Sequence, residues 1–107
     1  MASFDDREKA FEAEFKRNQE LQFRVNARCN RLFGLWAAAK LGIAAGDEAE
    51  SYARSVVDAD FEKPGDSDVI GKVQNDLNAK GIQISEAQLR AELARALDEA
   101  KRQLSQD

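Results

Sequence analysis

The sequence contains no histidine, and only one cysteine and one proline, among its 107 residues. Without histidine, most zinc-binding motifs, imidazole acid–base catalysis and imidazole pH sensing are excluded. With Cys29 alone, no internal disulfide can form, and we expect a reducing compartment. Because no histidine is present to activate the thiol, we interpret Cys29 as a small buried apolar group rather than a nucleophile.

Long apolar runs are also lacking. No segment approaches the roughly 20 apolar residues that cross a bilayer, and no signal peptide opens the chain, so we expect no direct membrane insertion. The net charge of −4 provides no general attraction to nucleic acid or anionic lipid. No residue pattern requires a cofactor. Asp66 and Asp68 are spaced as in a cation loop, but the further ligands are missing, and we interpret them as capping and surface acids.

Apolar residues recur at three- and four-residue steps, which is typical of helices. They predict helices at about residues 20–41, 47–62, 67–80 and 85–104. The fold class is therefore all-α: a four-helix bundle over residues 19–107, preceded by a mobile N-terminal helical arm over residues 1–18. Leu21, Val25, Cys29 and Leu32 belong to the apolar stripe of the first bundle helix. The large core residues are expected to be Phe33, Trp36, Tyr52 and Phe61.

Glycine and capping residues set the expected helix ends. Gly42 and Gly81 are expected to end the first and third helices. Asp47 is a candidate N-cap of the second helix, and Ser85 with Gln88 forms a capping box for the fourth. Nothing alternates with period two for long enough to predict a strand.

The arm carries only three large apolar residues among many charges: Phe4, Phe11 and Phe15. On a helix they fall within about 40° of one another, a stripe narrower than a core-facing helix needs. Such a helix fits the groove of another protein. Polar residues at positions 18, 19 and 22 interrupt the stripe, so we expect a hinge or frayed stretch near residues 17–20. Because isolated helices of about 15 residues are marginal in water, the arm is expected to be partly disordered when free.

Three motifs resemble the ζ (zeta) subunit, the inhibitor of the F-type ATPase of alphaproteobacteria. They are residues 4–12 (FDDREKAFE), 30–38 (NRLFGLWAA) and 60–69 (DFEKPGDSDV). The resemblance covers essentially the whole chain. It implies a non-enzymatic inhibitor located in the cytoplasm, peripheral to the inner membrane through the ATP synthase. Its partner would be the catalytic head, where the arm would enter the interface between the catalytic α/β pair and the γ subunit and block ATP hydrolysis.

The resemblance also implies which residues contact the partner. The inhibitory stretch runs from Phe4 to about Arg17, and the implied contacts are Phe4, Asp5, Asp6, Arg7, Glu8, Lys9, Phe11, Glu12 and Phe15. The alternative is that the phenylalanine stripe folds back onto the bundle or simply extends it.

A second candidate surface is a basic stripe opposite the apolar face of the first bundle helix, formed by Arg17, Arg24, Arg28 and Arg31. One interpretation is a solvated face. The other is a contact with an acidic partner or with phosphate, because guanidinium groups suit both. A scaffold or binding module that uses this stripe is the alternative function.

Overall fold

We describe the fold from a computed structural model, which covers residues 4–62 and 66–105, with side chains at 18–60 and 68–105. These residues form four α-helices and no strand: α1 (Phe4–Lys40), α2 (Asp47–Glu62), α3 (Asp66–Ala79) and α4 (Glu86–Ser105). The predicted all-α class and helical N-terminal arm are confirmed, and the bounds of α2, α3 and α4 agree with prediction within one residue.

The main correction concerns α1, which is one continuous helix of 37 residues rather than a helix beginning near residue 20. Asn18, Gln19 and Gln22 interrupt the apolar stripe but not the helix, because they are ordinary helix residues and no glycine or proline occurs between positions 4 and 33. The division into an arm of residues 1–18 and a bundle of residues 19–107 stays a prediction, as does the partial disorder of the free arm.

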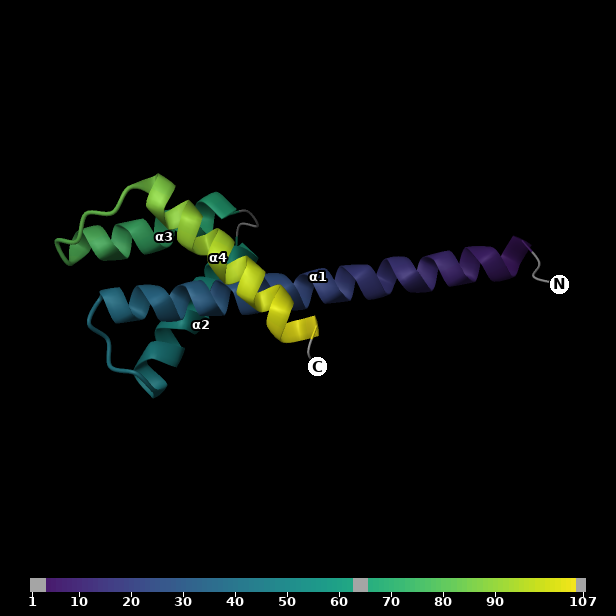
Figure 1. Ribbon diagram of the computed structural model, residues 1–107, viewed down its shortest axis with the longest axis horizontal. Coiled ribbons are helices and arrows are strands. Elements are labelled where there is room, and N and C mark those ends of the chain that lie inside the picture. Colours follow the sequence, from purple (N-terminus) through teal and green to yellow (C-terminus); the bar gives the residue numbers. More distant parts are fainter. Residues whose placement is uncertain (1–3, 63–65, 106–107) are drawn as a thin grey trace.

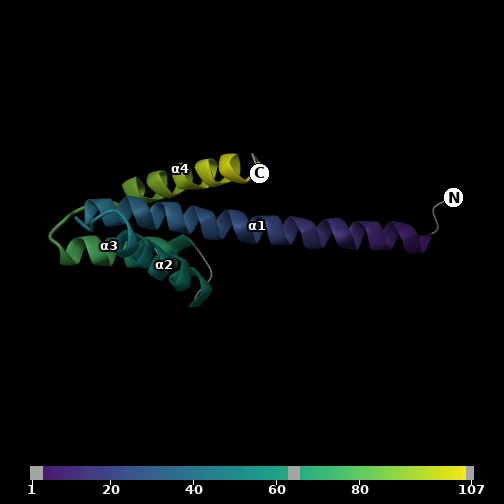
Figure 2. The same ribbon diagram turned by 90° about the horizontal axis from the view of Figure 1, so that it is seen from below.

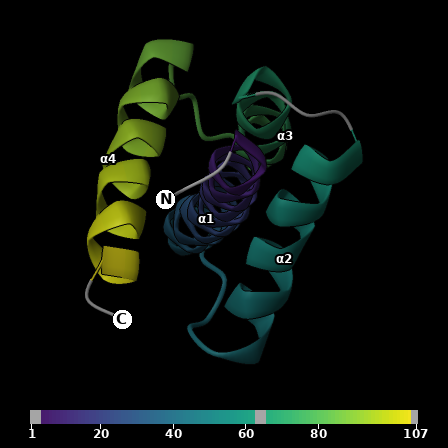
Figure 3. The ribbon, with the colours of Figure 1, turned by 90° about the vertical axis from the view of Figure 1, so that its right-hand side faces the viewer.

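The other three helices of the described residues are arranged around α1. Figures 1 and 2 show its N-terminal half projecting far beyond the other three helices. Viewed along its axis, α1 lies in the centre, with α4 on one side and α2 and α3 on the other (Figure 3). The principal extents are 65 × 25 × 22 Å and the radius of gyration is 17.3 Å, against about 13 Å for a compact chain of 100 residues. The projecting helix accounts for the excess.

The core lies where the C-terminal half of α1 meets the other helices. Phe33 is fully buried and stacks on Trp36 with ring centroids 5.7 Å apart. Cys29 is buried as predicted, with its thiol 3.7 Å from the Leu93 carbonyl. Trp36 and Tyr52 are only half-buried, so their predicted place as core residues holds in part. The side chain of Phe61 lies outside the described residues. Several of the buried residues of α1 and α2 are small: Ala37 and Ala38 in α1, and Ala49 and Ala53 in α2.

Most of the predicted helix ends are confirmed. Gly42 and Gly81 both have positive φ, 78° and 77°, and each is followed by the 6→1 backbone hydrogen bond of a Schellman motif. Ser85 and Gln88 form the capping box, with the Gln88 N–H 3.1 Å from Ser85 Oγ. One cap is corrected. The residue before α2 is Gly46, whose carbonyl accepts a hydrogen bond from the Glu50 N–H, so Asp47 is the first helical residue rather than the N-cap.

Candidate partner-binding surface

The projecting half of α1 holds all of the predicted inhibitory residues. Positions 4–17 form the first 14 residues of the helix, so the structure places Phe4, Phe11 and Phe15 on one continuous element with the bundle. Their side chains, like those of Arg17 and the charged residues between them, lie outside the described residues. Their role as contact residues therefore stays a prediction.

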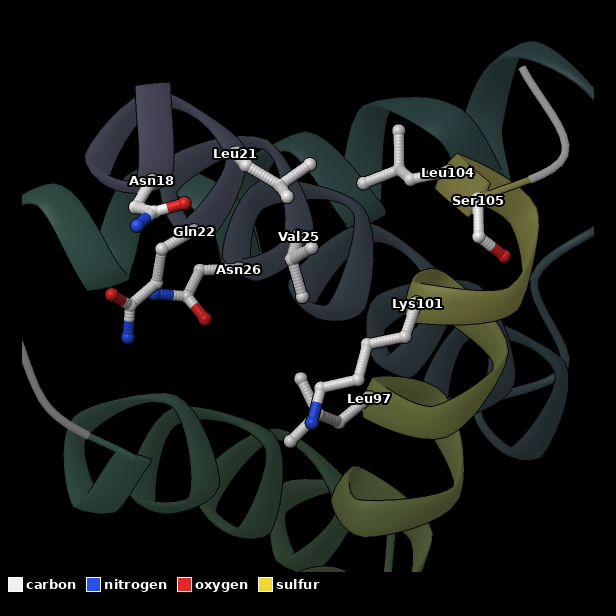
Figure 4. Close-up of a pocket in the computed structure, with 9 residues that line it drawn as sticks. All are labelled: Asn18, Leu21, Gln22, Val25, Asn26, Leu97, Lys101, Leu104 and Ser105. Carbon is white, nitrogen blue, oxygen red and sulfur yellow. The ribbon is translucent and has the colours of Figure 1, made fainter. Parts of the chain in front are cut away.

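Where the projecting half of α1 meets the bundle, α1 and the C-terminal half of α4 line an open groove of about 520 Å³. We call it the α1/α4 groove. Its residues are Asn18, Leu21, Gln22, Val25 and Asn26 of α1 with Leu97, Lys101, Leu104 and Ser105 of α4 (Figure 4). It combines four aliphatic side chains with amides, a hydroxyl and one ammonium group. Such a mixture of apolar surface with a few polar groups is typical of binding sites.

The groove exists because the apolar face of α1 continues past the point where the bundle covers it. Cys29 and Phe33 on this face are buried, Val25 is partly buried, and Leu21 is 49% exposed. Leu21 keeps its predicted place on the apolar stripe of α1, but the bundle leaves it half-exposed. In Figure 2, α4 diverges from α1 toward its C-terminal end, which explains the exposure.

A hydrogen-bonded chain fixes one side of the α4 end. Arg28 Nη1 donates to Gln103 Oε1 at 3.3 Å, and Gln103 Nε2 donates to Glu99 Oε1 at 3.1 Å. Glu99 also accepts from Arg102 Nε at 2.9 Å, and these hydrogen bonds, that from Arg102 first, lower the pKa of the Glu99 carboxyl. These hydrogen bonds tie the C-terminal end of α4 to α1 through Arg28 and Gln103. Lys101 lies on the other side of α4, in the groove.

The predicted basic stripe divides into residues with different environments. Arg31 is ion-paired with Glu50 of α2, with Nε 3.1 Å from Oε2. Arg28 is half-buried against Gln103, whereas Arg24 is exposed. Because two of these guanidinium groups already bind neighbouring helices, the arrangement does not favour a dedicated phosphate site. The stripe as a partner contact stays a prediction.

The sequence pattern did not identify the groove. Leu97 and Leu104 recur at helical spacing, so the pattern alone places them on an inward apolar face of α4, and it gives Lys101 no role. Only the angle between α1 and α4 shows that these residues stay partly uncovered. One signal in the sequence does point to the groove. Polar Asn18 and Gln22 occupy positions on the apolar stripe of α1, which indicates that this part of the stripe faces solvent.

The fold defines a small helical bundle from which the N-terminal half of one helix projects. Residues 1–103 match the family described as ATPase inhibitor subunit zeta, and the chain belongs to that family. A comparison with curated protein sequences finds no match. The membership confirms the predicted resemblance and supports an inhibitory role directed at an ATPase. Within the described ranges, no helix is long and apolar enough to cross a membrane.

Proposed function

We propose that this protein is a non-enzymatic regulatory subunit that inhibits ATP hydrolysis by the F-type ATP synthase. The N-terminal part of α1 inserts at the interface between the catalytic α/β pair and the γ subunit. The observation that carries the proposal is the continuous helix from Phe4 to Lys40, which projects beyond the bundle and presents three phenylalanine positions on one face. Through this contact the protein is peripheral to the inner membrane on the cytoplasmic side.

Inhibition of this kind needs no chemistry of its own. A catalytic interface that must open and close in each cycle stops when a rigid body occupies it. The 14 helical residues at positions 4–17 span about 21 Å at 1.5 Å per residue. Phenylalanine rings supply bulk on one face, and the bundle at the other end prevents the helix from passing through.

The binding energy limits what the three rings can do alone. Their burial would contribute roughly 5–9 kcal/mol at about 1.5–3 kcal/mol each, whereas association and ordering cost about 4–15 kcal/mol. Residues 1–17 carry five acidic and four basic side chains, so the segment is close to neutral. Specific charge pairs, rather than bulk attraction, should therefore set its register and add to its affinity.

The direct test replaces Phe11 and Phe15 with alanine, singly and together, and measures ATP hydrolysis by the isolated catalytic head as each variant is titrated in. Each substitution removes an aromatic anchor, and we expect at least about tenfold weaker inhibition for each, with a larger loss for the pair. Ala13→Gln lies on the opposite helix face, about 180° from the centre of these two positions, and serves as the matched control. The proposal would be contradicted if the double variant inhibited ATP hydrolysis half-maximally at the same concentration as the wild-type protein.

A further inference from the structure

We propose that the face of α1 opposite the phenylalanine positions is a second contact with the ATPase head, and that it binds an acidic segment of the head bearing an apolar side chain. The inference rests on the proposed function and adds to it a contact outside residues 4–17. The surface is an open hollow of about 550 Å³, which we call the arginine hollow. Its main residues are Phe23, Arg24, Arg28 and Arg31 of α1, with Val57 of α2 and Leu104 of α4.

The first argument is charge, which selects the occupant. Three arginines and no acidic residue line the hollow. Arg31 is ion-paired with Glu50, but Arg28 donates to the neutral amide of Gln103, so its charge is not compensated. Arg24 is exposed and forms no ion pair within the described residues. Two positive charges therefore face the hollow on a protein whose net charge is −4. Carboxylates are their complement, because guanidinium groups bind them through paired hydrogen bonds.

Acidic residues near the hollow do not cancel this charge. The adjoining hollow, which shares Phe23 and Arg24, adds a single acid, Glu20. Asp58 follows Val57 in α2, but successive residues lie about 100° apart around a helix, and Asp58 does not line the hollow. Since Glu20 offsets at most one of the two positive charges, the surface stays basic.

The second argument is the apolar surface beside these arginines. Phe23 is 56% exposed, more than any other large apolar side chain of the described residues, and Val57 and Leu104 are only partly covered. An ion such as phosphate would leave these side chains in water, because it has no apolar part. A protein segment with carboxylates and an apolar side chain fits the whole hollow. Aromatic residues and arginine are also the types enriched in protein interfaces.

The third argument is position along α1. Phe23 lies six residues beyond Arg17, where the predicted inhibitory stretch ends, or about 9 Å along the helix axis. At about 100° per residue, the α1 positions of the hollow centre roughly 170° from the centre of positions 4, 11 and 15. When residues 4–17 enter the head, the arginine hollow therefore lies at the mouth of that site, on the other side of the same helix. A head that contacts both faces encloses α1, which opposes its withdrawal.

A second copy of the chain fits the hollow less well. Across a two-fold axis through the hollow, the same arginines would face one another, which is unfavourable. An acidic segment of the head satisfies both the charged and the apolar part of the surface.

The test uses the full chain carrying Arg24→Glu or Phe23→Ser, with the isolated catalytic head as the probe. Both positions are exposed, so the fold should persist, and circular dichroism checks this. We expect roughly tenfold weaker binding for each variant, because one opposes the acidic partner and the other loses apolar contact. The loss in Arg24→Glu should shrink as salt is raised, since exposed charges are screened, whereas the loss in Phe23→Ser should not. Inhibition at saturating concentrations should remain complete, because residues 4–17 are unchanged.

Arg95→Glu is the matched control. It makes the same change in net charge on α4 outside the hollow, at a side chain that is 79% exposed. We expect it to bind the head like the wild type. Equal weakening by Arg24→Glu and Arg95→Glu would show that only the net charge matters, and would overturn the inference.

The outcomes separate this inference from the proposed function. Wild-type affinity in the folded Arg24→Glu and Phe23→Ser variants would overturn the second contact while leaving the role of residues 4–17 in place. A wild-type protein that binds the head without inhibiting it would refute the proposed function, and the binding assay would still report on the hollow. If sedimentation shows a dimer of the free protein that Phe23→Ser dissociates, the hollow belongs to a second copy and the inference is wrong.

Discussion

Single residues determine how closely the helices of the bundle approach. At Gly34, a Cβ atom would lie 2.7 Å from the Cα of Ala53 and 3.2 Å from its Cβ. The first distance is shorter than side-chain carbons tolerate and involves backbone of α2, which cannot rotate away. This contact explains why glycine stands at position 34 of the motif at residues 30–38. Here α1 and α2 cross at Gly34 and Ala53, where neither helix carries a large side chain.

Replacing Gly34 with alanine should destabilise the fold by about 1–3 kcal/mol, because the added methyl group forces α1 and α2 apart. Gly71 in α3 is the matched control, since a Cβ there meets nothing within 4 Å. Gly71→Ala should instead stabilise the protein by about 0.5–1 kcal/mol through helix propensity. Urea unfolding of both variants checks the two signs, and equal effects would contradict the proposed crossing.

Tyr52 links α2 to α3 and gives the fold a pH dependence. Its hydroxyl donates to Asp76 Oδ2 at 2.8 Å, and Lys72 Nζ lies 3.0 Å from the same oxygen and 5.4 Å from the tyrosine ring centroid. Burial, followed by the hydrogen bond to Asp76 and the charge of that carboxylate, raises the pKa of Tyr52 above its ordinary value near 10. The folded state therefore favours the protonated phenol.

Stability from this raised pKa is complete below pH 10 and is lost as the pH rises above 10, because the unfolded tyrosine ionises first. Tyr52→Phe should cost about 1 kcal/mol at pH 7. The difference in unfolding free energy between the two proteins should then shrink as the pH increases above 10. Denaturant unfolding at pH 7, 9 and 10.5 measures it, and a difference that grows with pH would have the wrong sign.

At the level of helices, most of the fold could be predicted from the sequence. Gly42, Gly81 and the Ser85–Gln88 capping box each have a local cause, and the structure confirms them. The continuity of α1 was missed because polar Asn18 and Gln19 were interpreted as a break in the helix rather than in its apolar face. The groove was missed because its opening depends on the angle between α1 and α4, which no local pattern encodes.

The continuity of α1 has a functional consequence that a single substitution can test. Gln19→Pro removes a backbone N–H and introduces a steric clash, at a cost of about 3 kcal/mol to an intact helix. If inhibition requires α1 to stay rigid between the bundle and residues 4–17, this variant should inhibit ATP hydrolysis at least about tenfold more weakly. Gln19→Ala, which preserves the helix, should inhibit like the wild type. Full inhibition by the proline variant would instead support a hinge near residues 17–20.

For the whole molecule, shape is the distinguishing property. The radius of gyration of 17.3 Å reflects a helix held away from a small bundle. Small-angle X-ray scattering of the free protein should give a value of about 17 Å or more. A value near the roughly 13 Å of a compact chain would show instead that the N-terminal segment folds back onto the bundle.

The measurement that tests the central claim most directly compares the full chain with a version that lacks residues 1–18. Circular dichroism first establishes that residues 19–107 keep their helical fold. Both proteins are then titrated against the catalytic head while ATP hydrolysis is followed. The account predicts that the full chain stops hydrolysis and that the folded, shortened chain does not. Equal inhibition by the two would contradict it, because the projecting end of α1 would then have no part in the mechanism.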